Sequence, residues 1–391
     1  MKYKSLIFLL SFSFGSLFLS CNEAPNYVGK AIKVSCSEDD KISVHSIELI
    51  KSIDIVQLQS GDVPVGNVDK IVSCDTFLYI LDREIQKVWI FDVKGRYHST
   101  IMGKGHGANE YTELTDIFID KEHATLNLVC RNDRKILLYD LTGNFFVRQK
   151  KLPKSFMSLI KLPGVYIGFM GNYSEDSLYP DNLWIMDDSL SIIGSGISIK
   201  PELESRYRMS MTPLSTYNGI CYCICQMERD VYTCDSANHI YPLYHYNFGD
   251  MNLPKLTKKD IDDPQRMFKI ANTCITGLDA FQETDNYLLA LCLYHGQQTL
   301  IVYNKKNKDS KIVSLDVDEE KYLLRFGRIQ GMDDQHIYST LEPDDVYSVY
   351  QGANQYNNFI ETHPQQVANL REKLGELQKN DNPYIMIYSV R

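Results

Sequence analysis

The segment Val88-Trp-Ile-Phe-Asp92 is a short apolar run that ends in an aspartate, and it returns at a nearly constant interval along the chain. The steps between successive terminal aspartates are 48, 47 and 48 residues. The aspartate can cap the following turn through its side chain, and a nearby glycine such as Gly95 or Gly143 accepts a positive φ. The recurrences are Ile136-Leu-Leu-Tyr-Asp140, Leu183-Trp-Ile-Met-Asp187 and Val231-Tyr-Thr-Cys-Asp235, followed after 69 and 85 residues by Leu300-Ile-Val-Tyr-Asn304 and Tyr384-Ile-Met-Ile-Tyr-Ser389.

Each repeat holds three further strand-like segments around this run. In the first repeat, Asp69–Ser73 and Phe77–Leu81 precede it and Arg96–Ile101 follows it. Four short strands in a unit of 40–50 residues are typical of the antiparallel meander that forms one blade of a β-propeller. Six such units fit between Gly66 and Arg391, so the sequence predicts an all-β, six-bladed propeller. Five or seven blades remain as alternatives.

The two ends of the repeat array are incomplete in complementary ways. Ile53–Leu58 reads as a strand without a blade, and Tyr384–Tyr388 is a third strand with no fourth strand after it. The N-terminal strand is therefore expected to supply the outer strand of the last blade. Such a closure removes the open sheet edge that a circular array would otherwise leave.

The N-terminus reads as an export signal. Lys2 and Lys4 precede an apolar run, Leu6–Leu19, which is too short for a comfortable membrane-spanning helix. At the end of this run, Leu17-Phe-Leu-Ser-Cys21 resembles a bacterial lipobox. The resemblance implies that Cys21 is the lipid-attachment residue and anchors the protein in the membrane. A simple secreted protein is the alternative. We therefore expect a signal peptide over 1–20, a flexible tether over 21–44 and the propeller domain over 45–391.

Composition and cysteine usage exclude some classes of function. The chain of 391 residues has 41 basic and 50 acidic residues, a net charge of −9, so it lacks the positive surface that nucleic-acid binding requires. Nine cysteines remain besides Cys21, an odd number that cannot form a fully paired disulfide framework. Cys221, Cys223 and Cys225 alternate along one strand, and we interpret them as small buried apolar residues and not as metal ligands.

Two insertions interrupt the repeat. Residues 249–272 contain a segment with Thr257 as a plausible helix N-cap. Residues 363–379 carry Val367, Leu370, Leu374 and Leu377 at the spacing of one helix face, which predicts a short amphipathic helix packed on a blade.

The chain resembles the six-bladed β-propeller lipoproteins of Bacteroides-like bacteria, which are related to the NHL-repeat propellers. The resemblance covers about residues 45 to 391. It implies an exported propeller in the bacterial envelope, on the periplasmic or surface side of the outer membrane, and little about activity, because propellers host many functions. The matching segments are Gly66-Asn-Val-Asp69-Lys-Ile, Trp89-Ile-Phe-Asp92 with Lys94-Gly95, Gly103-Lys-Gly105-His-Gly107-Ala-Asn-Glu110-Tyr111, and Asn380-Asp-Asn-Pro383-Tyr-Ile-Met-Ile-Tyr388.

Propeller geometry predicts where a ligand would bind. Strands alternate in direction, so loops between second and third strands emerge on the same face as the connections between blades. Loops that converge there make a plausible pocket. Polar loops also cap turns and pair with their neighbours, so this is a prediction for each residue and not a conclusion. The candidate ligand-binding residues are His106, Glu110, Tyr111, Arg131, Asn132, Asn172, Tyr173, Glu228, Arg229, His295 and Glu342.

These observations favour a binding or recognition module for a glycan, a peptide or a protein partner of the envelope, with no cofactor. The sequence contains no G-x-S-x-G, H-E-x-x-H or C-x-x-C motif, so an enzyme is the less favoured class. The alternative is a hydrolase or lyase like the Ca²⁺-dependent lactonases, with Glu110, Asp116, Asn172 and Glu228 near the channel. A scaffold within an envelope complex is a third hypothesis.

Overall fold

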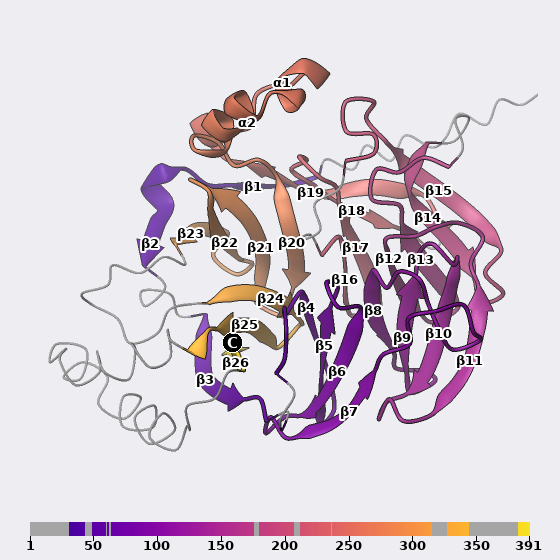
Figure 1. Cartoon of the computed structure of the whole chain (residues 1–391). Helices are drawn as coiled ribbons and strands as arrows, with labels where there is room; N and C mark the ends of the chain where they lie inside the picture. The colour runs from indigo at the N-terminus through magenta and orange to yellow at the C-terminus, as the bar shows by residue number, and fades with distance from the viewer. Residues whose placement is uncertain are drawn as a thin grey trace, which may run out of the picture. The chain divides into compact units, whose positions relative to one another are not determined.

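The computed structural model describes residues 31–43, 49–59, 61, 64–175, 180–206, 212–235, 237–314, 327–343 and 382–391. In these residues the strands form six antiparallel meanders of four strands arranged in a ring, the β-propeller that the repeat predicts (Figure 1). The first strand of each blade lies innermost. Blade 1 comprises β4 (Lys70–Cys74), β5 (Phe77–Asp82), β6 (Lys87–Asp92) and β7 (Tyr97–Ile101); blade 2 comprises β8 (Asp116–Asp120), β9 (Thr125–Cys130), β10 (Lys135–Asp140) and β11 (Phe146–Lys151); blade 3 comprises β12 (Ser158–Leu162), β13 (Val165–Phe169), β14 (Asp181–Asp187) and β15 (Ile192–Ser198).

Blades 4 to 6 complete the ring. Blade 4 comprises β16 (Leu214–Tyr217), β17 (Ile220–Ile224), β18 (Asp230–Cys234) and β19 (Ile240–Asn247); blade 5 comprises β20 (Leu278–Glu283), β21 (Tyr287–Tyr294), β22 (Gln297–Asn304) and β23 (Asp309–Ser314); blade 6 comprises β24 (Arg328–Met332), β25 (His336–Leu341), β26 (Tyr384–Val390) and β3 (Ile50–Gln57). The strand β3 therefore provides the outer strand of the last blade, as the incomplete array ends predict.

The aspartates that end the third strands hold the next turn. Asp92 Oδ1 accepts hydrogen bonds from the backbone N–H groups of Lys94 at 2.9 Å and Arg96 at 3.0 Å. Asp187 accepts in the same way from Ser189 and Ser191, both at 2.9 Å. Since a side chain satisfies backbone donors in each turn, the repeated aspartate has a local structural reason.

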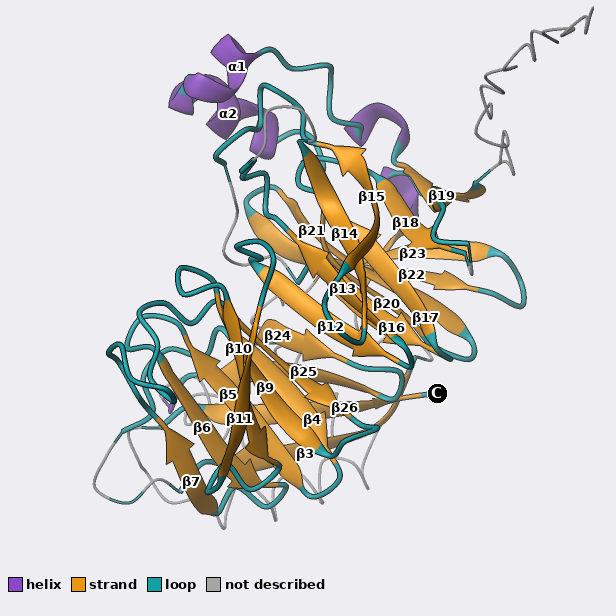
Figure 2. Ribbon diagram, turned by 90° about the vertical axis from the view of Figure 1, so that its right-hand side faces the viewer, coloured by secondary structure: helices purple, strands orange, loops and turns teal. Residues whose placement is uncertain are grey.

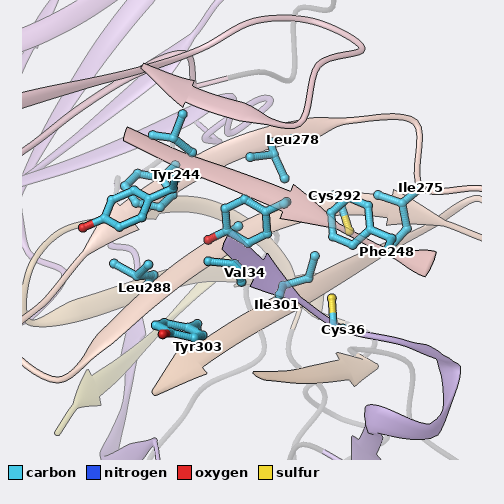
Figure 3. Packing of buried hydrophobic residues seen from close by; sticks show 14 of the residues in the cluster. Val34, Cys36, Tyr244, Phe248, Ile275, Leu278, Leu288, Cys292, Ile301 and Tyr303 are labelled. Atoms are coloured by element: carbon cyan, nitrogen blue, oxygen red, sulfur yellow. The ribbon is translucent and has the colours of Figure 1, made fainter. Parts of the chain in front are cut away.

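The core lies between blades. Six clusters of buried apolar side chains each join two neighbouring sheets, and one of them packs Tyr338 and Ile385 of blade 6 against Leu78 and Trp89 of blade 1. Figure 3 shows the cluster between blades 4 and 5, where Tyr244 and Leu288 face each other across the interface. Every blade therefore buries both faces, which explains why strands such as β9 and β14 are buried almost throughout.

The prediction of a tether that runs to residue 44 is wrong for the described part of that segment. β1 (Ile32–Ser35) pairs in parallel with β19, and β2 (Lys41–Ser43) pairs in parallel with β23. Each covers the outer edge of a blade, and Val34 is fully buried in the cluster of Figure 3. The segment reads as aperiodic because three or four residues are too few to display an alternation. The described part of the propeller therefore includes residues 31–43, ahead of the predicted start at residue 45.

The two predicted insertions have different outcomes. Residues 258–262 form α1 (Lys258–Asp262), and Thr257 caps it by accepting a hydrogen bond from the Asp260 N–H, as expected. A second helix, α2 (Pro264–Ala271), follows with Asp263 as its cap, and the pair stands at the edge of the propeller (Figure 2). The amphipathic helix predicted over 363–379 lies outside the described residues.

The cysteine predictions agree with the structure. Cys36, Cys74, Cys130, Cys221, Cys223, Cys225, Cys234, Cys274 and Cys292 are all free thiols. Cys221, Cys223 and Cys225 pack in one cluster between blades 3 and 4, while Tyr222 and Ile224 pack on the opposite side of the strand. The alternating thiols therefore serve as small apolar core residues.

Candidate functional site

The propeller presents two faces with different connections. We call the face with the loops between second and third strands and the connections between blades the loop face. The opposite face, with the turns between first and second strands and between third and fourth strands, is the turn face. Both follow from the strand order within each blade. The candidate residues predicted from the sequence belong to the loop face.

A central cavity of about 490 Å³ runs along the inner strands of all six blades. It is lined by segments of β4, β8, β12, β16, β20 and β24. Lining residues extend past the strand ends at Glu122, Pro163, Gly219 and Asp334, all in turns between first and second strands, so the cavity reaches the turn face. None of the candidate loop-face residues lines it.

A buried polar network links three inner strands at their loop-face ends. Lys70 Nζ lies 2.6 Å from Asp116 Oδ1 and donates a hydrogen bond of 3.1 Å to the Ile117 carbonyl. Ser158 Oγ donates to the other oxygen of Asp116. These side chains are the first residues of β4, β8 and β12 in blades 1, 2 and 3. Because Asp116 is only 2% exposed, both charges depend on this pairing, and the network is structural.

Two of the predicted residues meet across a blade boundary on the loop face. The guanidinium of Arg131, which follows β9 in blade 2, lies 4.3 Å from the centre of the Tyr173 ring, which follows β13 in blade 3. A cation over an aromatic face is attracted by the negative charge of the ring surface. The ring therefore fixes the position of the guanidinium, in a loop where a free arginine would sample many rotamers.

The guanidinium of Arg131 has few polar partners among the described residues. Its nearest carboxylate is Glu113 Oε2, 3.9 Å from Nη1, and neither group makes a hydrogen bond within the described residues. The Nε of Arg131 is buried, and its side chain is 19% exposed. Since buried donors normally have partners, a fixed guanidinium with unused N–H groups suggests a place for an anionic ligand group. Glu113 was not among the predicted residues, because only the fold brings it beside Arg131.

Three other candidate residues stabilise the loops in which they lie. Tyr111 is fully buried and donates a hydrogen bond of 2.6 Å to the Gln86 carbonyl, and burial raises its pKa. Glu110 accepts a hydrogen bond of 2.8 Å from the Gly107 N–H. Asn172 has a φ of 60° and is buried; its side-chain oxygen accepts a hydrogen bond from Asn182 Nδ2, and its backbone N–H donates one to Asn182 Oδ1. These contacts give each residue a structural role.

Glu228 and Arg229 line a second cleft of about 410 Å³ on the loop face of blade 4. Glu228 lies 2.9 Å from Lys200 Nζ and accepts a hydrogen bond of 2.8 Å from Tyr232 OH. Arg229 is hydrogen-bonded to Asn252. The cleft also contains functional groups that were not predicted, which lie on the connections before and after blade 4 and on its strands β18 and β19: Lys200, Glu202, Asp230, His245 and Lys255. His245 Nδ1 lies 2.7 Å from Asp230 Oδ1.

The remaining candidates lie on exposed loops. His106, Asn132 and Glu342 are exposed, and His295 is exposed with its ring centre 4.0 Å from that of Tyr294. The structure thus joins Arg131 with Tyr173 and places Glu228 and Arg229 in one cleft.

The residues considered for a Ca²⁺ site do not gather into one. Asp116 is bound by Lys70 and Ser158, and Glu228 by Lys200 and Tyr232. Within the described ranges, the group of acids and histidines whose ligand atoms lie within 4.8 Å of one another is Asp120, Glu122 and His123, on the turn face of blade 2. The Asp120 carboxylate accepts hydrogen bonds from the backbone N–H groups of Glu122 and His123. These hydrogen bonds give Asp120 a structural role in its own turn.

The helices among the described residues are too short or too polar to cross a membrane. A family model described as a domain of unknown function, DUF4934, matches residues 30–389. No protein of curated function matches the chain.

Three solved structures are similar to the chain, to different degrees. A Bacteroides fragilis protein described as exported superposes with a TM-score of 0.71 at 17% identity, over 92% of this chain and 99% of its own. A DUF4221 family member from Bacteroides vulgatus gives a TM-score of 0.49 at 10% identity, covering 88% of this chain and 97% of its own. A streptogramin B lyase gives 0.43 at 9% identity, covering 73% and 79%.

Proposed function

The chain belongs to the DUF4934 family, and we propose that it is an exported, lipid-anchored binding propeller of the bacterial envelope. It recognises a glycan, peptide or protein partner through its loop face. The leader with Lys2, Lys4 and Cys21 supports export and anchoring. The exported Bacteroides fragilis protein of the same fold agrees with that location.

One observation supports the loop face most directly. Arg131 is held against the Tyr173 ring, and its guanidinium donates no hydrogen bond within the described part of the chain. A guanidinium offers N–H groups in a fork that matches a carboxylate. Arg131 would therefore bind an anionic group of the partner, and the neighbouring cleft with Glu228 and Arg229 would extend the contact surface.

Isothermal titration of the full-length protein in detergent tests this proposal. The probes are sodium glucuronate, N-acetylneuraminate and an Asp-Gly-Asp tripeptide, with glucose as the neutral comparison. We expect at least one anionic probe to bind, and Arg131→Ala to weaken that binding about tenfold or more, since a hydrogen bond to a charged group contributes about 1.5–3 kcal/mol.

Arg134→Ala is the matched control. Arg134 lies in the same loop but is 50% exposed and paired with Glu175, so its removal should leave affinity within about twofold. The proposal fails if no anionic probe binds below about 10 mM, or if the two arginine variants weaken binding equally.

Anchoring has its own test. Cys21→Ser removes the thiol that the lipid chains require, so the variant should move from the membrane fraction to the soluble fraction and lose labelling by radioactive palmitate. A variant that stays in the membrane fraction with unchanged labelling would contradict the lipid anchor.

A further inference from the structure

The central cavity lies apart from the loop-face site, and its lining has an excess of negative charge. The three lysines are outnumbered by six carboxylates. The lysines are Lys70, Lys121 and Lys161, and the carboxylates are Asp69, Asp120, Glu122, Asp279, Asp333 and Asp334.

Two of the three lysines are already neutralised. Lys70 is paired with Asp116, which does not line the cavity. Lys161 has a side chain only 2% exposed, and its Nζ lies 2.6 Å from Asp188 and 2.8 Å from the Leu162 carbonyl. Some lining carboxylates also have partners outside the cavity, since Asp69 lies 4.0 Å from Arg83 and Asp333 lies 3.3 Å from His336. The uncompensated negative charge of the lining is therefore smaller than the count of residues indicates.

At the turn-face mouth, two carboxylates are available to a ligand. The Glu122 side chain is 58% exposed, and its closest cation is Lys161 at 3.8 Å. Asp334 is exposed, and its carboxylate has no ion pair or hydrogen bond among the described residues. Asp120 and Asp333 differ, because backbone N–H groups of their own turns already bind them. A multidentate metal cage at the mouth would have to break these turns.

The walls below the mouth are somewhat more apolar than polar. Ile119 and Met332 are partly exposed lining residues, whereas Leu214, Phe281 and Ile329 are at most 4% exposed and pack mainly between blades. Ser215 also lies on the lining, and its Oγ is a buried polar atom without a partner. The volume falls in the range of sites for small molecules, which are typically apolar with a few polar groups. A bare metal ion would leave these walls unused.

We propose that the central cavity binds a small organic cation, an amine with an apolar body, that enters from the turn face. The ammonium group lies at the mouth near Glu122 and Asp334, and the apolar body contacts the walls. This site is independent of Arg131 and of the loop face.

The test measures binding of tyramine and cadaverine to the full-length protein by isothermal titration. The neutral 1,5-pentanediol and the anionic glutarate have similar size and test the requirement for positive charge, and CaCl₂ tests for a metal ion. We expect both amines to bind more tightly than pentanediol, and glutarate not to bind.

Three variants locate the binding. Glu122→Gln combined with Asp334→Asn should weaken amine binding about four- to twenty-five-fold, because each exposed carboxylate contributes roughly a factor of two to five. Thr216→Trp, on an exposed lining position of β16, should abolish binding by filling the cavity. Asp39→Asn removes one carboxylate at an exposed position outside the cavity and should have no effect.

The inference is overturned if the amines do not bind below about 10 mM, if pentanediol binds equally well, or if CaCl₂ binds and the amines do not. It is also overturned if the charge-removing double variant and Asp39→Asn behave alike. Arg131→Ala should leave amine binding unchanged, so this result and the loop-face result are read separately.

Discussion

Val56 of β3 lies opposite Ile385 of β26, so blade 6 is built from both ends of the described chain. Buried Asn382 adds a second link: its side chain accepts a hydrogen bond of 2.8 Å from the Val65 N–H and donates one of 3.0 Å to the Leu58 carbonyl. Closing the ring in this way pairs a strand edge that would otherwise stay open, and holds blade 6 against blade 1.

Breaking this closure should destabilise the whole propeller. Val56 is 6% exposed and packs in the cluster between blades 6 and 1, so Val56→Asp places an unpaired charge in the core and should cost at least about 3 kcal/mol. Thermal unfolding followed by circular dichroism measures the loss. Ser52→Asp introduces the same charge at an exposed position of β3 and should leave the midpoint nearly unchanged. Equal effects of both variants would contradict closure by this strand.

The network of Lys70, Asp116 and Ser158 should show strong energetic coupling. Asp116→Leu leaves a buried ammonium without its partner and should lower the free energy of unfolding by about 3–5 kcal/mol. The double variant Lys70→Met with Asp116→Leu removes both charges and should recover most of that loss, as measured by urea denaturation. Additive losses in the double-mutant cycle would show that the two side chains do not depend on each other.

The ring of Tyr173 should position Arg131 through its aromatic face. Tyr173→Leu should weaken binding of an anionic probe about two- to fivefold, which corresponds to a partly exposed cation–π contact of about 0.5–1 kcal/mol. Tyr173→Phe keeps the ring and should keep the affinity, because the hydroxyl is not part of the contact. If the phenylalanine variant loses as much affinity as the leucine variant, the hydroxyl and not the ring matters.

The stability of blade 6 should depend on pH through Asp333 and His336, at the turn between β24 and β25. The hydrogen bond to Asp333 raises the pKa of His336 above 6.5, so its contribution is full below that pH and is lost as pH rises through the raised value. Burial opposes the ionisation of Asp333, but hydrogen bonds from His336 and Tyr338 lower its pKa below 3.8, so its contribution is lost on acidification.

The measurement is the unfolding midpoint of wild type and His336→Gln between pH 5 and pH 9. Because His336 is partly exposed, the difference between the two proteins should be no more than about 2 °C near pH 5 and should shrink towards pH 9. A difference that grows with pH would have the wrong sign for this pair.

The fold could be predicted because its determinants are local and repeated. Asp92 and Asp187 reach backbone N–H groups two and four residues ahead, so each copy leaves the same short pattern in the sequence. The closing strand could be inferred because both array ends were incomplete. The strands β1 and β2 could not, since each is short and is ordered by the blade edge that it pairs with.

The site could be predicted only in part. Loop topology placed Arg131 and Tyr173 on one face, but their contact depends on rotamers and on how blades 2 and 3 pack. Asn172 looked like a ligand-binding residue because it is polar and lies in a loop, whereas its side chain is used by Asn182 and by the Arg206 carbonyl. A propeller predicts a central channel, but the sequence pattern does not show which residues line it, because that depends on how the six inner strands meet.

A crystal structure of the protein grown with the tightest-binding anionic probe tests recognition through the loop face most directly. We expect a carboxylate of the probe within hydrogen-bond distance of Arg131, with the guanidinium still stacked on Tyr173. Density for the probe on the turn face alone, or on the loop face away from Arg131, would contradict it.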